Sequence, residues 1–156
     1  MTGHDHPVEA LLTAADPFEA ARRRCFACGE ENPHGLHMPV ELDGERFEAQ
    51  SRIVLDTHRQ GWEGVAHGGI VSTLLDEVLC YSLCERRPIF TVELSLRYKK
   101  AVPLGAPLTV SARRTGVRGR LAWAEGEIRN EAGDLLVTAQ AKFLRPRETA
   151  APADDT

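Results

Sequence analysis

The sequence predicts an α+β domain in which one long helix covers one face of a five- to six-stranded antiparallel sheet. Three observations support this. A single long stretch carries apolar residues at helical spacing. The chain after it alternates apolar and polar residues in short runs separated by turn residues, as half-buried antiparallel strands do. With 156 residues, 42% of them hydrophobic, the chain is long enough to build one core.

The two ends of the chain contrast with its middle. Residues 1–7 and 147–156 are rich in small, polar and proline residues, so we expect disordered ends around a single domain at 8–146. Val8–Arg24 has helix-forming content, and Asp16-Pro17 suits the start of a second short helix. The N-terminal segment of the domain is therefore expected to be helical.

A turn and a hairpin follow this segment. Cys25–Leu36 combines a Cys-x-x-Cys pair with glycines and an Asn-Pro turn, which predicts a compact turn ahead of the sheet. Leu36–Leu42 and Arg46–Val54 predict two strands, because Asp43-Gly44 between them is a favoured two-residue hairpin turn. Asp56–Gly64 breaks all periodicity and predicts an irregular loop.

The long helix is expected to begin at a glycine pair and to end near Arg86, before Pro88. Seven apolar residues share one half of its helical wheel: Ile70, Val71, Leu74, Leu75, Val78, Leu79 and Tyr81. The other half is small and nearly neutral: Gly69, Ser72, Thr73, Asp76 and Cys80. Asp76 is its only carboxylate, whereas Glu77 lies near the boundary of the halves and could reach solvent.

Four strands are expected after the helix. Alternation predicts them at Phe90–Lys99, Leu108–Arg113, Leu121–Arg129 and Leu135–Phe143, with turns at Pro103–Gly105, Thr115–Gly119 and Asn130–Gly133. One helix covers only one face of such a sheet. Its open edges favour pairing with a second copy.

Composition excludes several classes of function. A formal charge of -4 gives no electrostatic basis for nucleic-acid binding. No apolar run reaches the ~18 residues needed to span a bilayer, and the N-terminus lacks a signal-peptide pattern, so we expect no membrane partner and a cytoplasmic location. Four cysteines in such a chain are expected to be reduced.

The motif Q-G-W-x-G-x-x-H-G-G-x-x-x-x-L-x-D, from Gln60 to Asp76, resembles the hot-dog-fold acyl-CoA thioesterases of the PaaI-like branch of the 4-hydroxybenzoyl-CoA thioesterase superfamily. C-F-x-C-G-x-x-N-P-x-G-L before it and V-E-L-x-x-x-Y and P-x-G after it extend the resemblance from about Cys25 to about Leu144. The resemblance implies a hot-dog fold, in which a sheet wraps a central helix, and a homodimer or a dimer of dimers.

The resemblance also implies catalytic roles. The backbone N–H of Gly68 would polarise the thioester carbonyl, and Asp76 of the neighbouring subunit would attack it or activate water. Thr91 occupies the place of an assisting hydroxyl. Physical chemistry agrees, because a helix N-terminus is an N–H donor that can stabilise negative charge on a carbonyl oxygen, and an ionised aspartate can act as base or nucleophile.

Two further residues belong to this predicted catalytic group. Some relatives have an asparagine six residues before the histidine, where this chain has Gly61, so Gln60 is the amide available to position water or the carbonyl. His67 either bonds nearby backbone at the helix start, the interpretation we favour, or takes part in proton transfer.

Substrate-binding residues are expected around this group. Gly69 adjoins the predicted N–H donor, and Trp62, like Trp123, either lines an acyl channel or packs. Arg113 and Arg118 belong to a basic set that either forms a solvated face or meets the phosphates of coenzyme A. The full set is Lys99, Lys100, Arg113, Arg114, Arg118 and Arg120.

Metal binding at Cys25 and Cys28 is the alternative to packing. Their spacing is that of half a zinc site, which His34, His37, Cys80 or Cys84 would have to complete, but no second pair has the usual spacing. A redox role is disfavoured because the pair does not begin a helix in a βαβ unit. We expect small buried thiols, no metal and no cofactor.

The leading functional hypothesis is an acyl-CoA thioesterase that forms a free carboxylic acid and CoA. One alternative is a non-catalytic hot-dog module that binds acyl-CoA as a regulator or scaffold. Another is a hydratase on the same fold, for which the sequence shows no suitable pairing of an acid with a histidine. The acyl group and the choice between nucleophile and base for Asp76 stay open.

Overall fold

The computed structural model describes residues 22–85 and 88–145. Its elements in chain order are β1 (Glu41–Asp43), β2 (Glu48–Val54), the 3₁₀ helix η1 (Thr57–Arg59), α3 (Gly68–Ser82), β3 (Phe90–Tyr98), β4 (Pro107–Arg118), β5 (Leu121–Asn130) and β6 (Leu135–Leu144). The helix expected within Val8–Arg24 lies outside the described residues, apart from residues 22–24.

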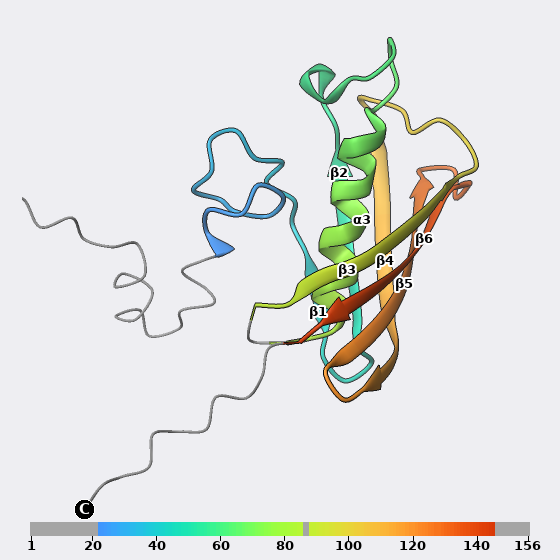
Figure 1. Ribbon diagram of the computed structural model, residues 1–156. Helices are drawn as coiled ribbons and strands as arrows, with labels where there is room; N and C mark the ends of the chain where they lie inside the picture. Colours follow the sequence, from blue (N-terminus) through green and yellow to red (C-terminus); the bar gives the residue numbers. More distant parts are fainter. Residues whose placement is uncertain (1–21, 86–87, 146–156) are drawn as a thin grey trace, which may run out of the picture.

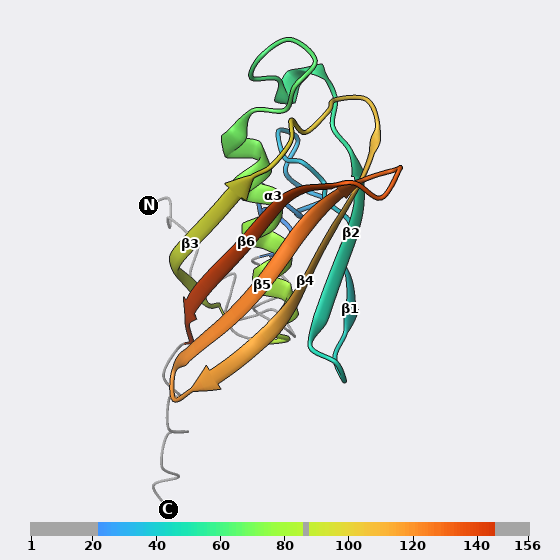
Figure 2. The ribbon, with the colours of Figure 1, turned by 90° about the vertical axis from the view of Figure 1, so that its right-hand side faces the viewer.

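The six strands form one antiparallel sheet in the order β1-β2-β4-β5-β6-β3. The helix α3 lies along one face of this sheet (Figure 1), and the view turned by 90° looks onto the sheet with α3 behind it (Figure 2). This is the predicted α+β arrangement. Because β1 and β3 end the order, both are edge strands.

The core lies between α3 and the sheet. Five aliphatic side chains of the predicted apolar half of α3 are buried: Val71, Leu74, Leu75, Val78 and Leu79. Each contributes about 1.5–3 kcal/mol when fully buried. The sheet packs closely against the helix at Gly126, where an added Cβ would lie 3.3 Å from Cδ2 of Leu79 and 2.7 Å from the carbonyl oxygen of Ser111.

The helix ends earlier than expected. The prediction near Arg86 is wrong, because α3 ends at Ser82 and Cys84 adopts a left-handed backbone conformation with φ 54°. The N–H of Leu83 closes the last turn on the carbonyl of Cys80 at 3.2 Å. No helix among residues 22–85 and 88–145 is long and apolar enough to cross a membrane.

The predicted hairpin is correct in its pairing but wrong in its turn. Asp43 pairs with Glu48, so four residues, 44–47, form the connection in place of Asp43-Gly44. The Asp43 carboxylate accepts hydrogen bonds from the N–H groups of Glu45 and Arg46, at 3.1 Å each, and so stabilises a longer turn.

The first strand of this hairpin is also shorter than predicted. Only Glu41–Asp43 pairs with β2, because the backbone before it bonds elsewhere. The N–H groups of Leu36 and Met38 each donate at 2.8 Å to carbonyls of the Cys25 turn, at Phe26 and Ala27. Leu36–Val40 is therefore held by the turn and not by the sheet.

The turn predicted at Thr115–Gly119 lies mostly inside β4. This strand continues to Arg118, with an irregularity between Arg114 and Gly116, and Gly119-Arg120 makes the turn. Gly119 has φ +58°, a conformation that glycine adopts without strain, so the reversal occurs there.

The edge strand β3 is more exposed than its alternation predicts. Phe90, Val92 and Tyr98 are 64%, 54% and 53% exposed, although all three belong to its predicted apolar face. A register shift lies between Thr91 and Glu93. Within residues 22–85 and 88–145, a single copy therefore leaves the outer edge of β3 unpaired, with large apolar side chains on it.

Candidate active site

His67 is the N-cap of α3. Its Nδ1 accepts a hydrogen bond of 2.9 Å from the N–H of Gly69, and its own N–H donates to the carbonyl of Arg59 at 2.8 Å. Because Nδ1 accepts, the neutral ring carries its proton on Nε2. The geometry is that of the favoured interpretation, a helix-start residue bonded to nearby backbone.

Gly68 is the first residue of α3. Among the described residues, no acceptor for its N–H is found, whereas its carbonyl accepts a hydrogen bond of 2.7 Å from the hydroxyl of Tyr98. The free N–H lies at the positive end of the helix dipole. It can therefore donate to an anion or to a polarised carbonyl oxygen.

Tyr98 was not identified from the sequence as part of this site. Alternation assigned it to a strand face, and the V-E-L-x-x-x-Y motif marked it, but neither indicates which backbone atom its hydroxyl meets. A hollow of about 360 Å³ lies beside Tyr98 and Gly68, and Lys99 and Lys100 also line it. Two of the predicted basic residues thus lie next to the start of α3.

The loop before α3 positions its first residue. The side-chain oxygen of Gln60 accepts a hydrogen bond of 3.1 Å from the N–H of Gly64, and Gln60 pairs with Ala66 across the loop. At Gly61 an added Cβ would lie 3.0 Å from Cα of His67, so a side chain there would crowd the cap. Gln60 therefore shapes this loop.

Trp62 lies in the same loop and is 85% exposed. Against the described residues of one copy it makes little packing contact, so its indole is open to a ligand or a second copy.

Asp76 lies in the middle of α3 and meets the start of β3. The hydroxyl of Thr91 donates a hydrogen bond of 2.7 Å to Oδ1 of Asp76. The predicted acid and the predicted hydroxyl are thus in direct contact through one of the two carboxylate oxygens. Both side chains come from elements that pack together, α3 and β3.

Gly68 and Asp76 do not lie close enough to act on one thioester within a single chain. They are eight residues apart on one helix, and a rise of 1.5 Å per residue separates them by about 12 Å along the axis. A reacting carbonyl needs its oxygen donor and its nucleophile or base each within about 3 Å. One chain therefore does not bring these two predicted groups to the same thioester.

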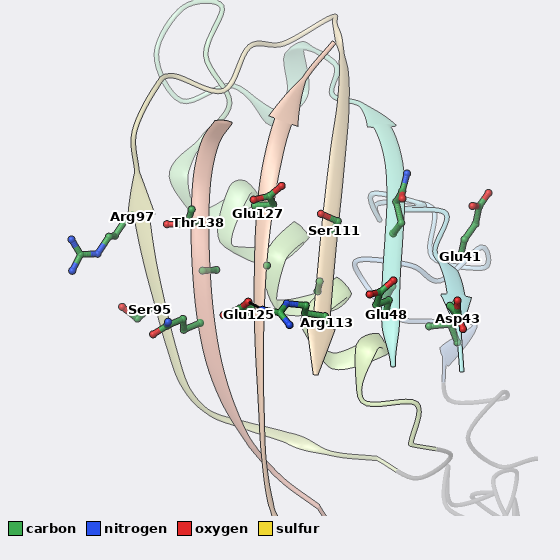
Figure 3. A pocket seen from close by; sticks show the side chains of 17 residues that line it. Glu41, Asp43, Glu48, Ser95, Arg97, Ser111, Arg113, Glu125, Glu127 and Thr138 are labelled. Atoms are coloured by element: carbon green, nitrogen blue, oxygen red, sulfur yellow. Dashed lines mark ion pairs between the residues drawn. The ribbon is translucent and has the colours of Figure 1, made fainter. Parts of the chain in front are cut away.

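The two arginines predicted to bind substrate, Arg113 and Arg118, lie away from the start of α3. Arg113 forms an ion pair with Glu125 on the face of the sheet opposite the helix, as Figure 3 shows. A hollow of about 970 Å³ on that face is lined by many acidic side chains. Arg118 is exposed at the end of β4. The structure does not bring either arginine to Gly68 or Asp76 of the same chain.

A separate cluster contains the two cysteines of the Cys-x-x-Cys turn and Glu77. A hydrogen bond with Cys28 lowers the pKa of the Cys25 thiol to about 5 and raises the pKa of Cys28. Burial raises the pKa of Glu77 to about 7. Glu77 is half-buried, because the turn packs against it and Sγ of Cys25 lies 3.7 Å from its Oε1.

Comparison with known proteins agrees with this architecture. Residues 63–137 match the family model described as the thioesterase superfamily. Acyl-coenzyme A thioesterase THEM4 of Rattus norvegicus is 28% identical over 103 residues, which cover 63% of this chain and 45% of that protein. The chain spans about half the length of the curated relatives that it matches.

Solved structures show the same fold. A crystal structure described as a thioesterase superfamily protein aligns with a TM-score of 0.72 and 29% identity, covering 78% of this chain and 63% of that one. A mutant of the phenylacetic acid degradation protein PaaI from Thermus thermophilus aligns with a TM-score of 0.64 and 22% identity, covering 71% and 95%. The chain has the hot-dog fold of these proteins. Its residues 63–137 match the thioesterase superfamily model, which agrees with the predicted resemblance.

Proposed function

We propose that this protein hydrolyses an acyl-CoA thioester to a free carboxylic acid and CoA, at sites built from two copies of the chain. One observation carries the proposal: Gly68 offers a free N–H at the start of α3, while the Asp76 carboxylate, hydrogen-bonded to Thr91, lies about 12 Å further along the same helix. Each copy holds one donor and one acid. Pairing two copies would combine them.

The edge strand β3 supports such pairing. It ends the sheet, and its apolar side chains Phe90, Val92 and Tyr98 are more than half exposed. Two β3 edges running side by side would join both sheets and cover this apolar surface. Thr91 lies on the same strand, so a partner placed there would lie next to Asp76. We propose a homodimer, which can in turn form a dimer of dimers.

The chemistry follows from these positions. The Gly68 N–H holds the thioester oxygen as negative charge develops on it, an interaction whose loss typically costs ~10²–10³ in rate. Asp76 of the partner either removes a proton from the attacking water or attacks the carbonyl carbon itself. If Asp76 acts as base, collapse of the tetrahedral intermediate breaks the C–S bond, and the proton that Asp76 took from water passes to the departing CoA thiolate. If Asp76 attacks directly, cleavage of the C–S bond releases the CoA thiolate and leaves a mixed anhydride, which water hydrolyses to the free acid and the Asp76 carboxylate while one proton passes to the thiolate.

The substrate class rests on three features. The rat relative is named an acyl-coenzyme A thioesterase. Lys99 and Lys100 line the hollow beside Gly68, where their ammonium groups suit the phosphates of CoA. Trp62 and Gly69 lie near the same helix start, where they would contact the acyl end. Arg113 and Arg118 would take part only from positions supplied by the second copy.

A thiol-release assay tests the proposal. The full chain is incubated with acyl-CoAs that carry short, medium-length and aromatic acyl groups, and the released CoA is separated and quantified. Wild type should release CoA, and Asp76→Asn should lose at least ~10² of that rate because the amide is neither a base nor a nucleophile. Glu131→Gln, which changes an exposed carboxylate that pairs with Arg52, is the matched control.

The outcomes separate the candidate functions. Equal rates for wild type and Asp76→Asn would remove Asp76 from the mechanism. Saturable acyl-CoA binding without any release would favour the non-catalytic binding module. A single turnover in ¹⁸O-labelled water distinguishes the two roles of Asp76, because nucleophilic attack followed by hydrolysis at the side-chain carbonyl leaves label in that carboxylate.

A further inference from the structure

The cluster of Cys25, Cys28 and Glu77 lies outside the proposed thioesterase site and has no part in that chemistry. One donor atom from each side chain lies within 4.8 Å of the other two, and Sγ of Cys25 is 3.7 Å from Oε1 of Glu77. All three side chains are half-buried. Among the residues that the structure describes, this is the one such group of three potential metal ligands.

The cluster forms where a loop meets the helix. In Figure 1 the segment that contains both cysteines lies beside α3 in blue. The N–H of Gly29 donates to the carbonyl of Cys25 at 2.9 Å, and an added Cβ at Gly29 would lie 2.4 Å from the nitrogen of Cys25, so this turn requires glycine. The tight turn brings both sulfurs to one side, opposite Glu77 on α3.

The donor set and its spacing suit one class of ion. Two thiolates and a carboxylate are ligands of Zn²⁺, with bonds of about 2.3 Å to sulfur and about 2.0–2.2 Å to oxygen. At tetrahedral angles these lengths place a sulfur and an oxygen ligand about 3.5 Å apart. The distance of 3.7 Å between Sγ of Cys25 and Oε1 of Glu77 is close to that value.

Among residues 22–85 and 88–145, no fourth His, Cys, Asp or Glu belongs to this group. Tyr81, one turn beyond Glu77, has its hydroxyl 3.2 Å from Sγ of Cys28 and forms one wall. His37, one of the ligands considered from the sequence, bonds the carbonyl of Asn32 through Nε2 at 2.5 Å. A tetrahedral ion would have its fourth position left for water.

We propose that Cys25, Cys28 and Glu77 bind one divalent zinc-like ion that fastens the turn at residues 22–38 to α3. The third ligand, the carboxylate of Glu77, is far from the two cysteines in the sequence. The Cys-x-x-Cys spacing alone therefore favoured packed thiols without a metal. Each bound ion displaces the protons of both thiols. None of the three ligands belongs to the proposed thioesterase site at Gly68 and Asp76, so the ion would connect the turn to α3 without taking part in that reaction.

Cobalt titration of the reduced, metal-stripped full chain tests this proposal. Wild type should bind one Co²⁺ per chain and show thiolate-to-cobalt charge-transfer absorption with the intense visible bands of a tetrahedral ion, which Zn²⁺ then abolishes by displacement. Glu77→Gln keeps both thiols and nearly the same shape. It should weaken binding by at least about 10–100-fold, the loss typical when even a group that only supports a metal ligand is removed. Cys28→Ser should remove most of the charge-transfer band.

Cys84→Ser is the matched control, because Cys84 is also a half-buried free cysteine but lies outside the cluster. It should bind cobalt as wild type does. Circular dichroism checks that each variant is folded. If Cys28→Ser does not fold, Glu77→Gln still tests the proposal. Absence of binding in reduced wild type, or equal affinity in Glu77→Gln, would overturn the proposal whatever the esterase assay shows.

Discussion

Gly68→Pro removes one N–H from the proposed site and leaves the helix in place. Gly68 is the first residue of α3, the position at which proline is best tolerated. The preceding His67 has φ -61° and ψ 135°, within the extended region that a residue before proline adopts. The N–H that is lost has no acceptor among the described residues, so no hydrogen bond of the fold is broken.

The predicted effect is on catalysis alone. Loss of one preorganised donor to the developing oxyanion costs about 2.7–4 kcal/mol, so kcat should fall by ~10²–10³. Stability should change little, since the substitution also reduces the freedom of the unfolded chain, a gain of about 0.4–1 kcal/mol where the conformation fits. Steady-state release of CoA and thermal unfolding measure the two quantities separately.

Gly68→Ala is the matched control. Its Cβ would lie 3.6 Å from the hydroxyl oxygen of Tyr98, an ordinary contact, and its N–H is kept. Its kcat should stay within a few-fold of wild type by the same reasoning, because the donor is unchanged. A folded Gly68→Pro protein with kcat near wild type would refute the role of the Gly68 N–H.

Three other predictions test the site and the core. Thr91→Val removes the hydroxyl that donates to Asp76 at 2.7 Å and should lower kcat about 10-fold, whereas Thr91→Ser should retain it; equal rates would exclude a positioning role. Burial raises the pKa of Cys80 from 9.0 to about 12, so its thiolate fraction at pH 8 should be ~10³ lower in the native than in the unfolded chain. Its alkylation rate, measured by mass spectrometry, should fall by the same factor, and similar rates in the two states would contradict this. Because the pKa of Cys80 is higher in the folded than in the unfolded chain, its protonated thiol favours the folded state fully below pH 9, and this stability is lost as pH rises toward 12. Gly126→Ala should destabilise the fold by about 1–3 kcal/mol in a denaturant titration, because its Cβ would lie 2.7 Å from the carbonyl oxygen of Ser111; an unchanged midpoint would contradict the packing.

Local patterns predicted the fold because its main signals are local. Helical spacing places Val71 to Leu79 against the sheet, and alternation places β4 to β6. The end of the helix was missed because nothing in the sequence requires Cys84 to take φ 54°. The turn after Asp43 was missed because its carboxylate can bond two N–H groups, which competes with a two-residue turn.

The site was predicted in part for the same reason. His67, Gly68 and Gly69 are adjacent in sequence, so their helix-start geometry is local. The contact of Asp76 with Thr91 depends on the packing of α3 against β3, and it was anticipated only through the family resemblance. The hydroxyl of Tyr98 on Gly68 and the approach of Glu77 to Cys25 were missed, since helical and strand periodicity define a face but not the partner that meets it.

Activity in a mixed dimer tests the two-copy site most directly. Asp76→Asn and Gly68→Pro chains carrying different tags are coexpressed, and the mixed species is isolated through both tags. A symmetric pair has two equivalent sites, and the mixed pair rebuilds one of them from an intact Gly68 and an intact Asp76. Its specific activity should be about half that of wild type, because one of two sites is complete. A mixed species as inactive as both parents would contradict a site shared between copies.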